Sequence, residues 1–261
     1  MSTNNKEIFA HVPYPFIRDN LPLILERRIN PELFFPADVL DSFIPEELAA
    51  IAGALAQNGL KTTIHGPFMD LNPGSAEPLL RKATISRFHR AMDAAAILKP
   101  RVIVLHPGYD KWRYGGMQQT WLGFAVDTFR EMAARAQEIG CTIAVENIFE
   151  EEPSTLRALL EALDSPFVRH CFDVGHWNLF ARVGLEEWFA ELGGFIAETH
   201  IHDNRGERDD HAPLGEGEID FELFFGLMER YAPDATWTIE AHSREALERS
   251  LVNIERYRSP R

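Results

Sequence analysis

Six short apolar segments of the chain carry a histidine or an acidic side chain at their end. The segments read TTIHG, VIVLHPG, IAVENIF, CFDVGH, ETHIHDN and TIEAHS. Their polar residues are His65, His106, Glu146, Asp173, His200 and Glu240. Successive members lie 27 to 41 residues apart, which leaves room for one helix and a return to the next strand. Burial of an unpaired acid or imidazole is costly, so six in the same phase predict that these side chains share a ligand.

Strand-like and helix-like segments alternate along the whole chain. Eight short apolar runs, from IFAHV at residue 8 to TWTIEAH at residue 236, are separated by segments whose apolar residues recur every three to four positions. No Pro/Gly/Ser-rich linker divides the chain. We therefore predict a single α/β domain over residues 1–261, a (β/α)8 TIM barrel. In such a barrel the carboxyl ends of all strands open on one face, where active sites are built.

The alternation of side chains along the strands predicts which of them point into the barrel. In IAVEN, Ala144 and Glu146 share one face, while Ile143 and Val145 share the other. The segment TWTIE has the same pattern, with Glu240 in phase with two threonines. We therefore expect the bulky apolar side chains to pack against helices and the polar ones to lie inside the barrel mouth. Histidines and carboxylates that converge there most naturally hold a metal ion.

Composition restricts the class of protein. Hydrophobic residues make up 45% of the chain and charged residues 25%, as in ordinary soluble proteins. The net charge of −14 disfavours nonspecific binding of nucleic acid. The opening MSTNNKEIFAHV lacks a signal pattern, and no apolar run approaches the roughly 18 residues of a membrane span. We expect a cytoplasmic protein without a membrane partner, in which Cys141 and Cys171 are buried thiols.

The motifs HGPF, HPG, VEN, FDVGH, HIHDN, D-x-H followed by GEG, and IEAH resemble those of the xylose-isomerase-like, endonuclease IV-type barrel superfamily. The resemblance covers nearly the whole chain and implies up to three zinc ions. The first ion would be held by His65, His106 and Glu146. The second would be held by Glu146, Asp173, His200 and Glu240. The third would be held by His176, Asp209 and His211. Nitrogen and oxygen ligands without thiolate suit zinc, although manganese or another divalent ion also fits.

The presence of all nine implied ligands favours hydrolysis. We predict a metal-dependent hydrolase of a phosphoester, specifically a small-molecule phosphodiester that is attacked by a metal-activated hydroxide. The same resemblance implies an alternative, a sugar or sugar-phosphate isomerase or epimerase with one divalent ion. Either enzyme would use Glu146 and Glu240 as catalytic groups, and in the alternative they pass a proton on and off carbon. A metal-loaded binding module without turnover is the non-enzymatic reading.

Duplex DNA is not the expected substrate. The segment HVPYPFIRDN lacks the glycine-rich GAHVS-like opening of the endonucleases, and the sixth strand reads DVGHWN in place of their DTCHAF. A phosphorylated or sugar-like small molecule is expected instead. One branch of the superfamily, which cleaves the nucleotide-loop phosphoester of cobamides, is similar to this chain in HGPF-x-DLNPGS and HIHDN.

Four further side chains are predicted to contact substrate. Arg205 and Arg208 belong to the loop that carries the third metal group, and their guanidinium forks suit a phosphate. His202 shares strand parity with His200, and Trp112 lies in a long loop of the kind that closes over active sites. The alternatives are structural: a solvated charged loop for the arginines and hydrogen-bonded packing for His202.

Overall fold

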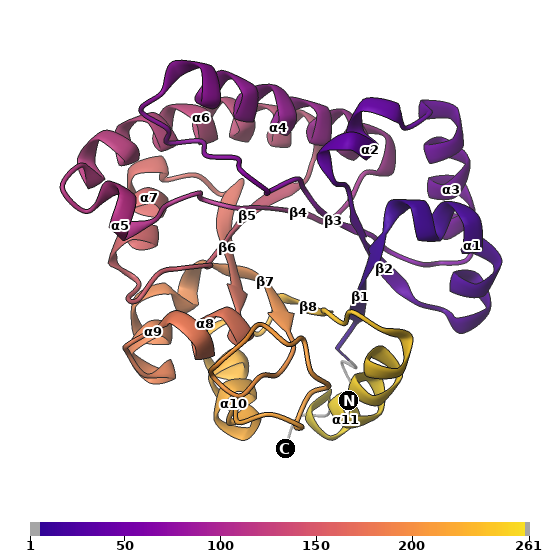
Figure 1. Cartoon of the computed structure of the whole chain (residues 1–261). Helices are drawn as coiled ribbons and strands as arrows, with labels where there is room; N and C mark the ends of the chain where they lie inside the picture. Colours follow the sequence, from indigo (N-terminus) through magenta and orange to yellow (C-terminus); the bar gives the residue numbers. More distant parts are fainter. Residues whose placement is uncertain (1–5, 259–261) are drawn as a thin grey trace.

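The strands form a closed barrel. The computed structural model describes residues 6–258 of the chain. Its eight strands are parallel and pair in chain order, and β8 pairs with β1 so that the barrel closes (Figure 1). The strands are β1 (Ile8–Pro13), β2 (Asn30–Phe34), β3 (Thr63–His65), β4 (Val102–Leu105), β5 (Thr142–Glu146), β6 (Val168–Asp173), β7 (Ile196–Ile201) and β8 (Thr236–Ile239). The predicted single (β/α)8 barrel is confirmed.

A ring of helices surrounds the strands (Figure 1). The helices are α1 (Tyr14–Arg27), α2 (Ala37–Ser42), α3 (Pro45–Gln57), α4 (Pro78–Leu98), α5 (Lys111–Tyr114), α6 (Gln118–Ile139), α7 (Ser154–Leu163), α8 (Val174–Phe180), α9 (Leu185–Leu192), α10 (Phe221–Tyr231) and α11 (Arg244–Arg258), with a 3-10 turn at Gly193–Phe195. Within residues 6–258, none of these helices is long and apolar enough to cross a membrane.

Prolines interrupt two of the helices that the apolar spacing predicts. The spacing predicts one helix over residues 38–59, but the structure has α2 and α3 with an extended residue, Ile44, between them. Pro45 causes the break because proline lacks an N–H group and its ring disfavours helical geometry at the preceding residue. In α1, Asn20 leaves the helical region with a φ of −130°, two residues before Pro22.

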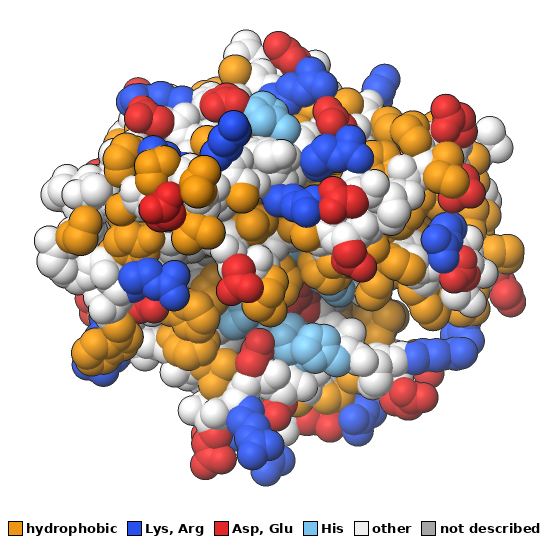
Figure 2. All heavy atoms as spheres, turned by 45° about the horizontal axis from the view of Figure 1, so that its top comes forward, with side chains coloured by type: hydrophobic (Ala, Val, Ile, Leu, Met, Phe, Trp, Pro, Cys, Tyr) orange, Lys and Arg blue, Asp and Glu red, His pale blue; other side chains and the backbone are white. Residues whose placement is uncertain are grey.

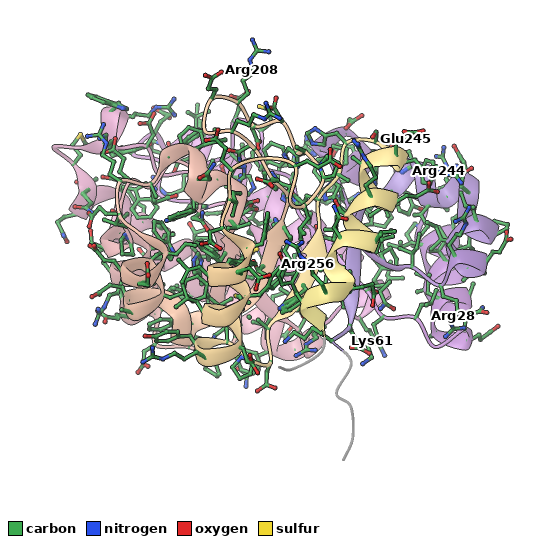
Figure 3. The ribbon with its side chains drawn as sticks, turned by 90° about the horizontal axis from the view of Figure 1, so that it is seen from below. Arg28, Lys61, Arg208, Arg244, Glu245 and Arg256 are labelled. Atoms are coloured by element: carbon green, nitrogen blue, oxygen red, sulfur yellow. The ribbon has the colours of Figure 1, made fainter. Side chains whose placement is uncertain are left out.

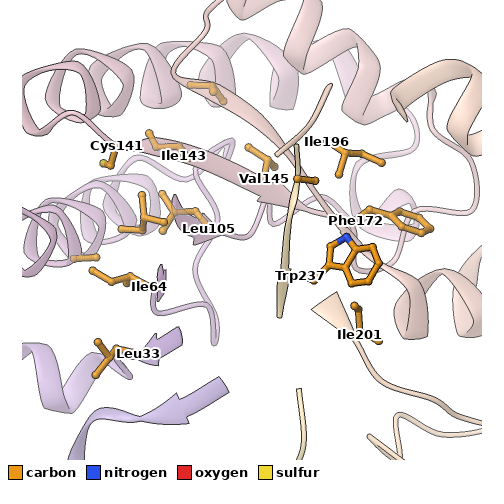
Figure 4. Close-up of a cluster of buried hydrophobic side chains, with 14 of the residues drawn as sticks. Leu33, Ile64, Leu105, Cys141, Ile143, Val145, Phe172, Ile196, Ile201 and Trp237 are labelled. Carbon is orange, nitrogen blue, oxygen red and sulfur yellow. The ribbon is translucent and has the colours of Figure 1, made fainter. Parts of the chain in front are cut away.

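The strand side chains separate into two sets, as the alternation predicts. The outward set packs beneath the helices in the main hydrophobic core and includes Leu33, Ile64, Leu105, Ile143, Val145 and Phe172 (Figure 4). The second set is a separate apolar cluster of Val102, Val104, Ala144 and Cys171. Ala144 and Val104 have the parity of Glu146 and His106, so this second cluster lies inside the barrel, below the polar residues of the mouth.

The inside of the barrel also carries polar side chains. Glu32 on β2 and Glu198 on β7 are fully buried, as are Thr63 and Thr238. The hydroxyl group of Thr238 donates a hydrogen bond to Glu198. Buried carboxyl groups are rare unless they are paired, so these two acids indicate a polar layer that supports the residues at the mouth.

The loop between β7 and α10 is organised by the buried carboxylate of Asp203. This carboxylate accepts hydrogen bonds from the backbone N–H groups of Asn204, Gly215, Gly217 and Ile219. A Cβ atom on Gly217 would lie 2.2 Å from Asp203 Oδ1, so this close approach requires glycine. In Figure 1 the loop, drawn in orange, lies in front of α10 at the rim of the barrel, and two of its residues, Asp209 and His211, line the pocket described below.

Candidate metal centre and active site

The structure brings the six polar residues of the strand ends together. His65, Glu146 and Asp173 are the last residues of their strands, His106 and Glu240 directly follow theirs, and His200 is the last but one residue of β7. Because neighbouring residues of the opposite parity pack under the helices, these six side chains point into the mouth.

Glu146 lies at the centre of the site and faces two groups of histidines. Its Oε2 atom lies 3.3 Å from Nε2 of His65 and 3.0 Å from Nε2 of His106. Its Oε1 atom lies 3.3 Å from Nδ1 of His176 and 3.3 Å from Nδ1 of His200. Glu146 therefore has the position of a bridging carboxylate between the two groups.

His200 joins Glu146 to the other two acids of the strand ends. Its Nδ1 atom lies 3.4 Å from Glu240 Oε1 and 3.9 Å from Asp173 Oδ2. His200 and Asp173 are fully buried, whereas Glu240 lies at the floor of the open pocket. The group therefore combines two fully buried side chains, His200 and Asp173, with two carboxylates that line the pocket, Glu146 and Glu240.

The third predicted group is also assembled, across α8 and the loop after β7. Asp209 Oδ2 lies 3.1 Å from His211 Nε2 and 3.5 Å from His176 Nε2. The ring of His211 stacks on that of His202 with 3.9 Å between the ring centroids. His202 itself is fully buried, and its Nε2 lies 3.2 Å from Asp173. His202 thus lies beneath the pocket rather than in it.

The donor atoms of this site fit a divalent cation. Several are buried without a hydrogen-bond partner of suitable geometry among the described residues: His106 Nε2, Glu146 Oε2, His200 Nδ1, His202 Nδ1 and His211 Nδ1. Trios such as His65, His106 and Glu146 have ligand atoms within 4.8 Å of one another. Buried polar atoms rarely stay unpaired, and imidazole nitrogen with carboxylate oxygen is a donor set that binds divalent metals.

Glu146 and Glu240 are held in the ionised form. Burial by itself would raise the pKa of Glu146, but His200 and His106 outweigh it and keep that pKa well below its usual range. Burial likewise opposes ionisation of Glu240, and His200 and His11 lower its pKa well below the ordinary value. Ionised carboxylates are the form that binds a metal ion or accepts a proton from a substrate.

Two site residues were missed in the sequence, Glu32 and His11. Glu32 Oε2 lies 3.1 Å from Nε2 of His200, and its Oε1 lies 3.1 Å from Nδ1 of His11. The same His11 nitrogen lies 3.2 Å from Glu240 Oε1. The available signal was a charged residue within the apolar run PELFF, which is an unusual position for an acid with no partner.

A pocket of about 620 Å³ opens over these residues. Figure 2 shows histidine side chains, in pale blue, beside a hollow on this face of the molecule. The polar part of the lining includes His11, His65, His106, Glu146, His176, Asp209, His211 and Glu240. Large apolar side chains line the remainder, among them Phe34, Phe68, Met69, Phe149 and Phe180.

The structure does not bring the other predicted substrate contacts to this pocket. Arg205, Arg208 and Trp112 are exposed and do not belong to its lining. Figure 3 shows Arg208 at the tip of its loop, pointing away from the barrel. The side chain of Arg113, next to Trp112, lines the pocket instead. Strand parity cannot predict these directions because none of these residues lies in a strand.

The fold and this arrangement at the strand ends agree with the comparison to known families. The chain belongs to the xylose isomerase-like TIM barrel family, whose model matches residues 32–257.

Known proteins resemble the chain at moderate identity. It is 29% identical over 188 residues to the uncharacterized protein MJ1311 of Methanocaldococcus jannaschii. This match spans 69% of this chain and 64% of that protein, just under two thirds of its length. It is 26% identical over 210 residues to the L-ribulose-5-phosphate 3-epimerase UlaE of Salmonella paratyphi C. This match spans 77% of this chain and 72% of the epimerase. The structure of a D-tagatose 3-epimerase-like protein matches with a TM-score of 0.81 at 23% identity, over 96% of both chains.

The predicted phosphodiester hydrolase is wrong as the main function. The curated relatives that are named for an activity are L-ribulose-5-phosphate 3-epimerases, which favours the alternative. The prediction of hydrolysis depended on three bound ions, and nine ligand-type residues do not by themselves establish three ions. His65, His106, Asp209 and His211 all line the pocket and can contact substrate, so their presence does not require three ions. Without the hydrolase, zinc is not favoured over other metals. The nitrogen and oxygen donors suit a divalent ion.

Proposed function

We propose that the protein is a divalent-metal-dependent epimerase that inverts the carbon next to the carbonyl group of a sugar-like ketose. One observation carries the proposal. Glu146 and Glu240, from the ends of β5 and β8, approach the same imidazole: His200 Nδ1 lies 3.3 Å from one carboxylate and 3.4 Å from the other. Epimerisation needs a base and an acid on opposite faces of one carbon, and two carboxylates from non-adjacent strands supply them.

In this proposal, four residues would hold one ion: Glu146, Asp173, His200 and Glu240. When bound, a divalent cation polarises the carbonyl and the adjacent hydroxyl group and so acidifies the neighbouring C–H bond. Asp173 and His200 are fully buried and keep the site rigid. Glu146 and Glu240 line the pocket, so one takes the proton from carbon and the other delivers a proton to the opposite face.

The remaining five predicted ligands, His65, His106, His176, Asp209 and His211, surround this centre and line the pocket. We propose that they bind the hydroxyl groups of the substrate and fix which carbon lies between the two glutamates. An imidazole can donate to or accept from a hydroxyl group, and a carboxylate accepts from one, which suits a polyol. Alternatively, part of this group binds a second ion. The protein would then contain more than one metal equivalent per chain.

The comparisons support the proposal without extending it to one substrate. The L-ribulose-5-phosphate 3-epimerase named above acts on a ketose at the carbon beside the carbonyl group. Its 26% identity extends over 77% of this chain.

A substrate panel tests the proposed function. Metal-free protein is reloaded with Mn²⁺, Co²⁺ or Zn²⁺ and incubated with D-tagatose, D-fructose, L-ribulose and L-ribulose 5-phosphate, and products are separated by chromatography. We expect conversion of at least one ketose into its epimer, dependent on the metal and lost in Glu240→Gln. Tight ketose binding without conversion by any metal form contradicts the proposal and leaves a binding module.

A further inference from the structure

Large apolar side chains also line the pocket, and we call them the apolar wall: Phe34, Phe68, Met69, Phe149 and Phe180. Phe34 ends β2, and its ring stacks on Phe68 with 5.7 Å between centroids. Phe68 in turn stacks on His106 at 4.7 Å. Phe149 and Phe180, from the loop after β5 and the end of α8, make an edge contact at 5.1 Å. The apolar wall is therefore continuous with the ligand-type residues of the floor.

Two members of the apolar wall are strongly exposed although they line a pocket. The side chain of Met69 is 72% exposed and that of Phe149 is 53% exposed. Exposed apolar side chains that gather around a concave site mark a place where a ligand removes apolar surface from water. A polyol has little apolar surface to offer, so the hydroxyl-binding floor does not account for this wall.

Lysine and arginine side chains, which commonly hold a phosphate group, are scarce in the pocket lining. Asp70, Asp110 and Asp209 line it in addition to the two glutamates of the floor, while Arg113 is the one lysine or arginine among the described lining residues. A phosphate monoester carries close to two negative charges at neutral pH and is normally held by several charged or backbone donors. Figure 3 shows that Arg208 points away from the barrel, so it does not add to Arg113.

We propose that the substrate is an unphosphorylated sugar-like ketose that carries an aromatic substituent, and that this ring packs on the apolar wall. The inference rests on the proposed function for the ketose part, whereas the wall supplies the aromatic part. Phe149 is the main contact, because it is the most exposed ring of the wall and can stack on a ligand without rearrangement of the core. The cavity volume of about 620 Å³ lies in the usual range of about 300–1,000 Å³ for drug-sized ligands.

Three derivatives of one ketose test this inference. D-Tagatose bearing a methyl ether, a phenyl ether or a phosphate at O6 is titrated into the Mn²⁺-loaded protein, and Kd is measured by calorimetry. We expect the phenyl ether to bind at least tenfold more tightly than the methyl ether, and the phosphate to bind no more tightly than the methyl ether. Phe149→Ala should reduce the phenyl-to-methyl ratio at least fivefold. Phe16→Ala, which removes an exposed ring outside the pocket lining, is the matched control and should keep the ratio.

The outcomes separate this inference from the proposed function. The proposal of an aromatic substituent is overturned by any of three results, even where free ketoses are epimerised. These are equal binding of the phenyl and methyl ethers, tightest binding of the phosphate, and no binding of any derivative. A phenyl preference that Phe149→Ala removes supports the apolar wall, even where no ketose is converted and the epimerase proposal fails.

Discussion

Glu32 holds the far side of the His200 imidazole: its Oε2 lies 3.1 Å from His200 Nε2, in the buried interior of the barrel. This contact turns His200 Nδ1 toward Glu146 and Glu240. A carboxylate behind a histidine fixes its tautomer and orientation and raises its basicity as a metal ligand. The same Glu32 contacts His11, which reaches Glu240, so one buried acid supports both sides of the centre.

Glu32→Gln should weaken metal binding by about 10- to 100-fold, because the neutral amide holds the imidazole less firmly and lowers its basicity. Competition with a fluorescent chelator measures the affinity, and a circular dichroism melt checks the fold. Glu198→Gln is the matched control, since burial and the nearby Glu32 raise the pKa of Glu198 well above its usual value and leave it protonated. Equal losses in both variants would contradict a specific role for Glu32.

Glu146→Gln and Glu240→Gln should each stop epimerisation while the fold remains intact. General acid–base groups contribute about 10²- to 10⁴-fold to rate, and each variant removes one of the two. In D2O, each variant that retains metal should still exchange the C–H proton of one epimer, because the other carboxylate remains. NMR detects the exchange, and metal analysis separates lost chemistry from lost metal. Full epimerisation by either metal-loaded variant would exclude the two-carboxylate arrangement.

Asp209→Ala and His211→Ala should keep one metal equivalent per chain and raise KM, since the proposal assigns these residues to the substrate. Metal content is measured by elemental analysis after purification without chelator. Arg208→Ala is the control on the same loop, and we expect it to change neither metal content nor KM because its side chain points outward (Figure 3). Loss of a full equivalent in Asp209→Ala would establish a second ion at this loop instead.

The stability of the protein should fall between pH 7 and pH 5 because of His170. Burial lowers the pKa of this histidine to about 4, and its two nitrogens are occupied by the Val145 carbonyl and the Trp188 indole N–H. Below its unfolded pKa of about 6.5, the unfolded chain binds a proton that the folded chain does not, so stability falls with pH until about pH 4. The loss at pH 5 is roughly 2 kcal/mol.

Urea unfolding with chelator present measures this effect. His170→Gln is expected to be less stable at pH 7 but to lose roughly 2 kcal/mol less than the wild type on going to pH 5. His89→Gln, which changes an exposed histidine on α4, should keep the wild-type slope. Parallel pH profiles for the wild type and His170→Gln would show that other groups cause the acid sensitivity.

The barrel and the convergence of its strand ends could be predicted from the sequence because both follow from local periodicity. Ala144 and Glu146 alternate with Ile143 and Val145 along β5. In the structure Ile143 and Val145 belong to the main core under the helices, and Ala144 belongs to the apolar cluster inside the barrel. The prediction of one helix over residues 38–59 was wrong at Pro45, because apolar spacing alone does not register that proline rarely continues a helix.

The support of the site and the shape of the pocket could not be predicted in the same way. Glu32 contacts His200 across the barrel, a pairing of residues far apart in the chain. Arg208 lies in a loop and Trp112 in the short helix α5, where side-chain direction depends on the complete fold. The chemistry was misjudged because histidines and carboxylates in one pattern can bind either metal ions or substrate hydroxyl groups, and sequence spacing does not separate the two roles.

The most direct test of the central claim is solvent isotope incorporation during turnover. Metal-loaded protein is incubated in D2O with the ketose that it converts, and NMR locates deuterium in the product. We predict an epimer with deuterium at the inverted carbon next to the carbonyl, because the carboxylate that returns the proton exchanges with solvent. An epimer that retains its original hydrogen at that carbon, or metal-loaded protein that converts none of the ketoses, would contradict proton transfer by Glu146 and Glu240.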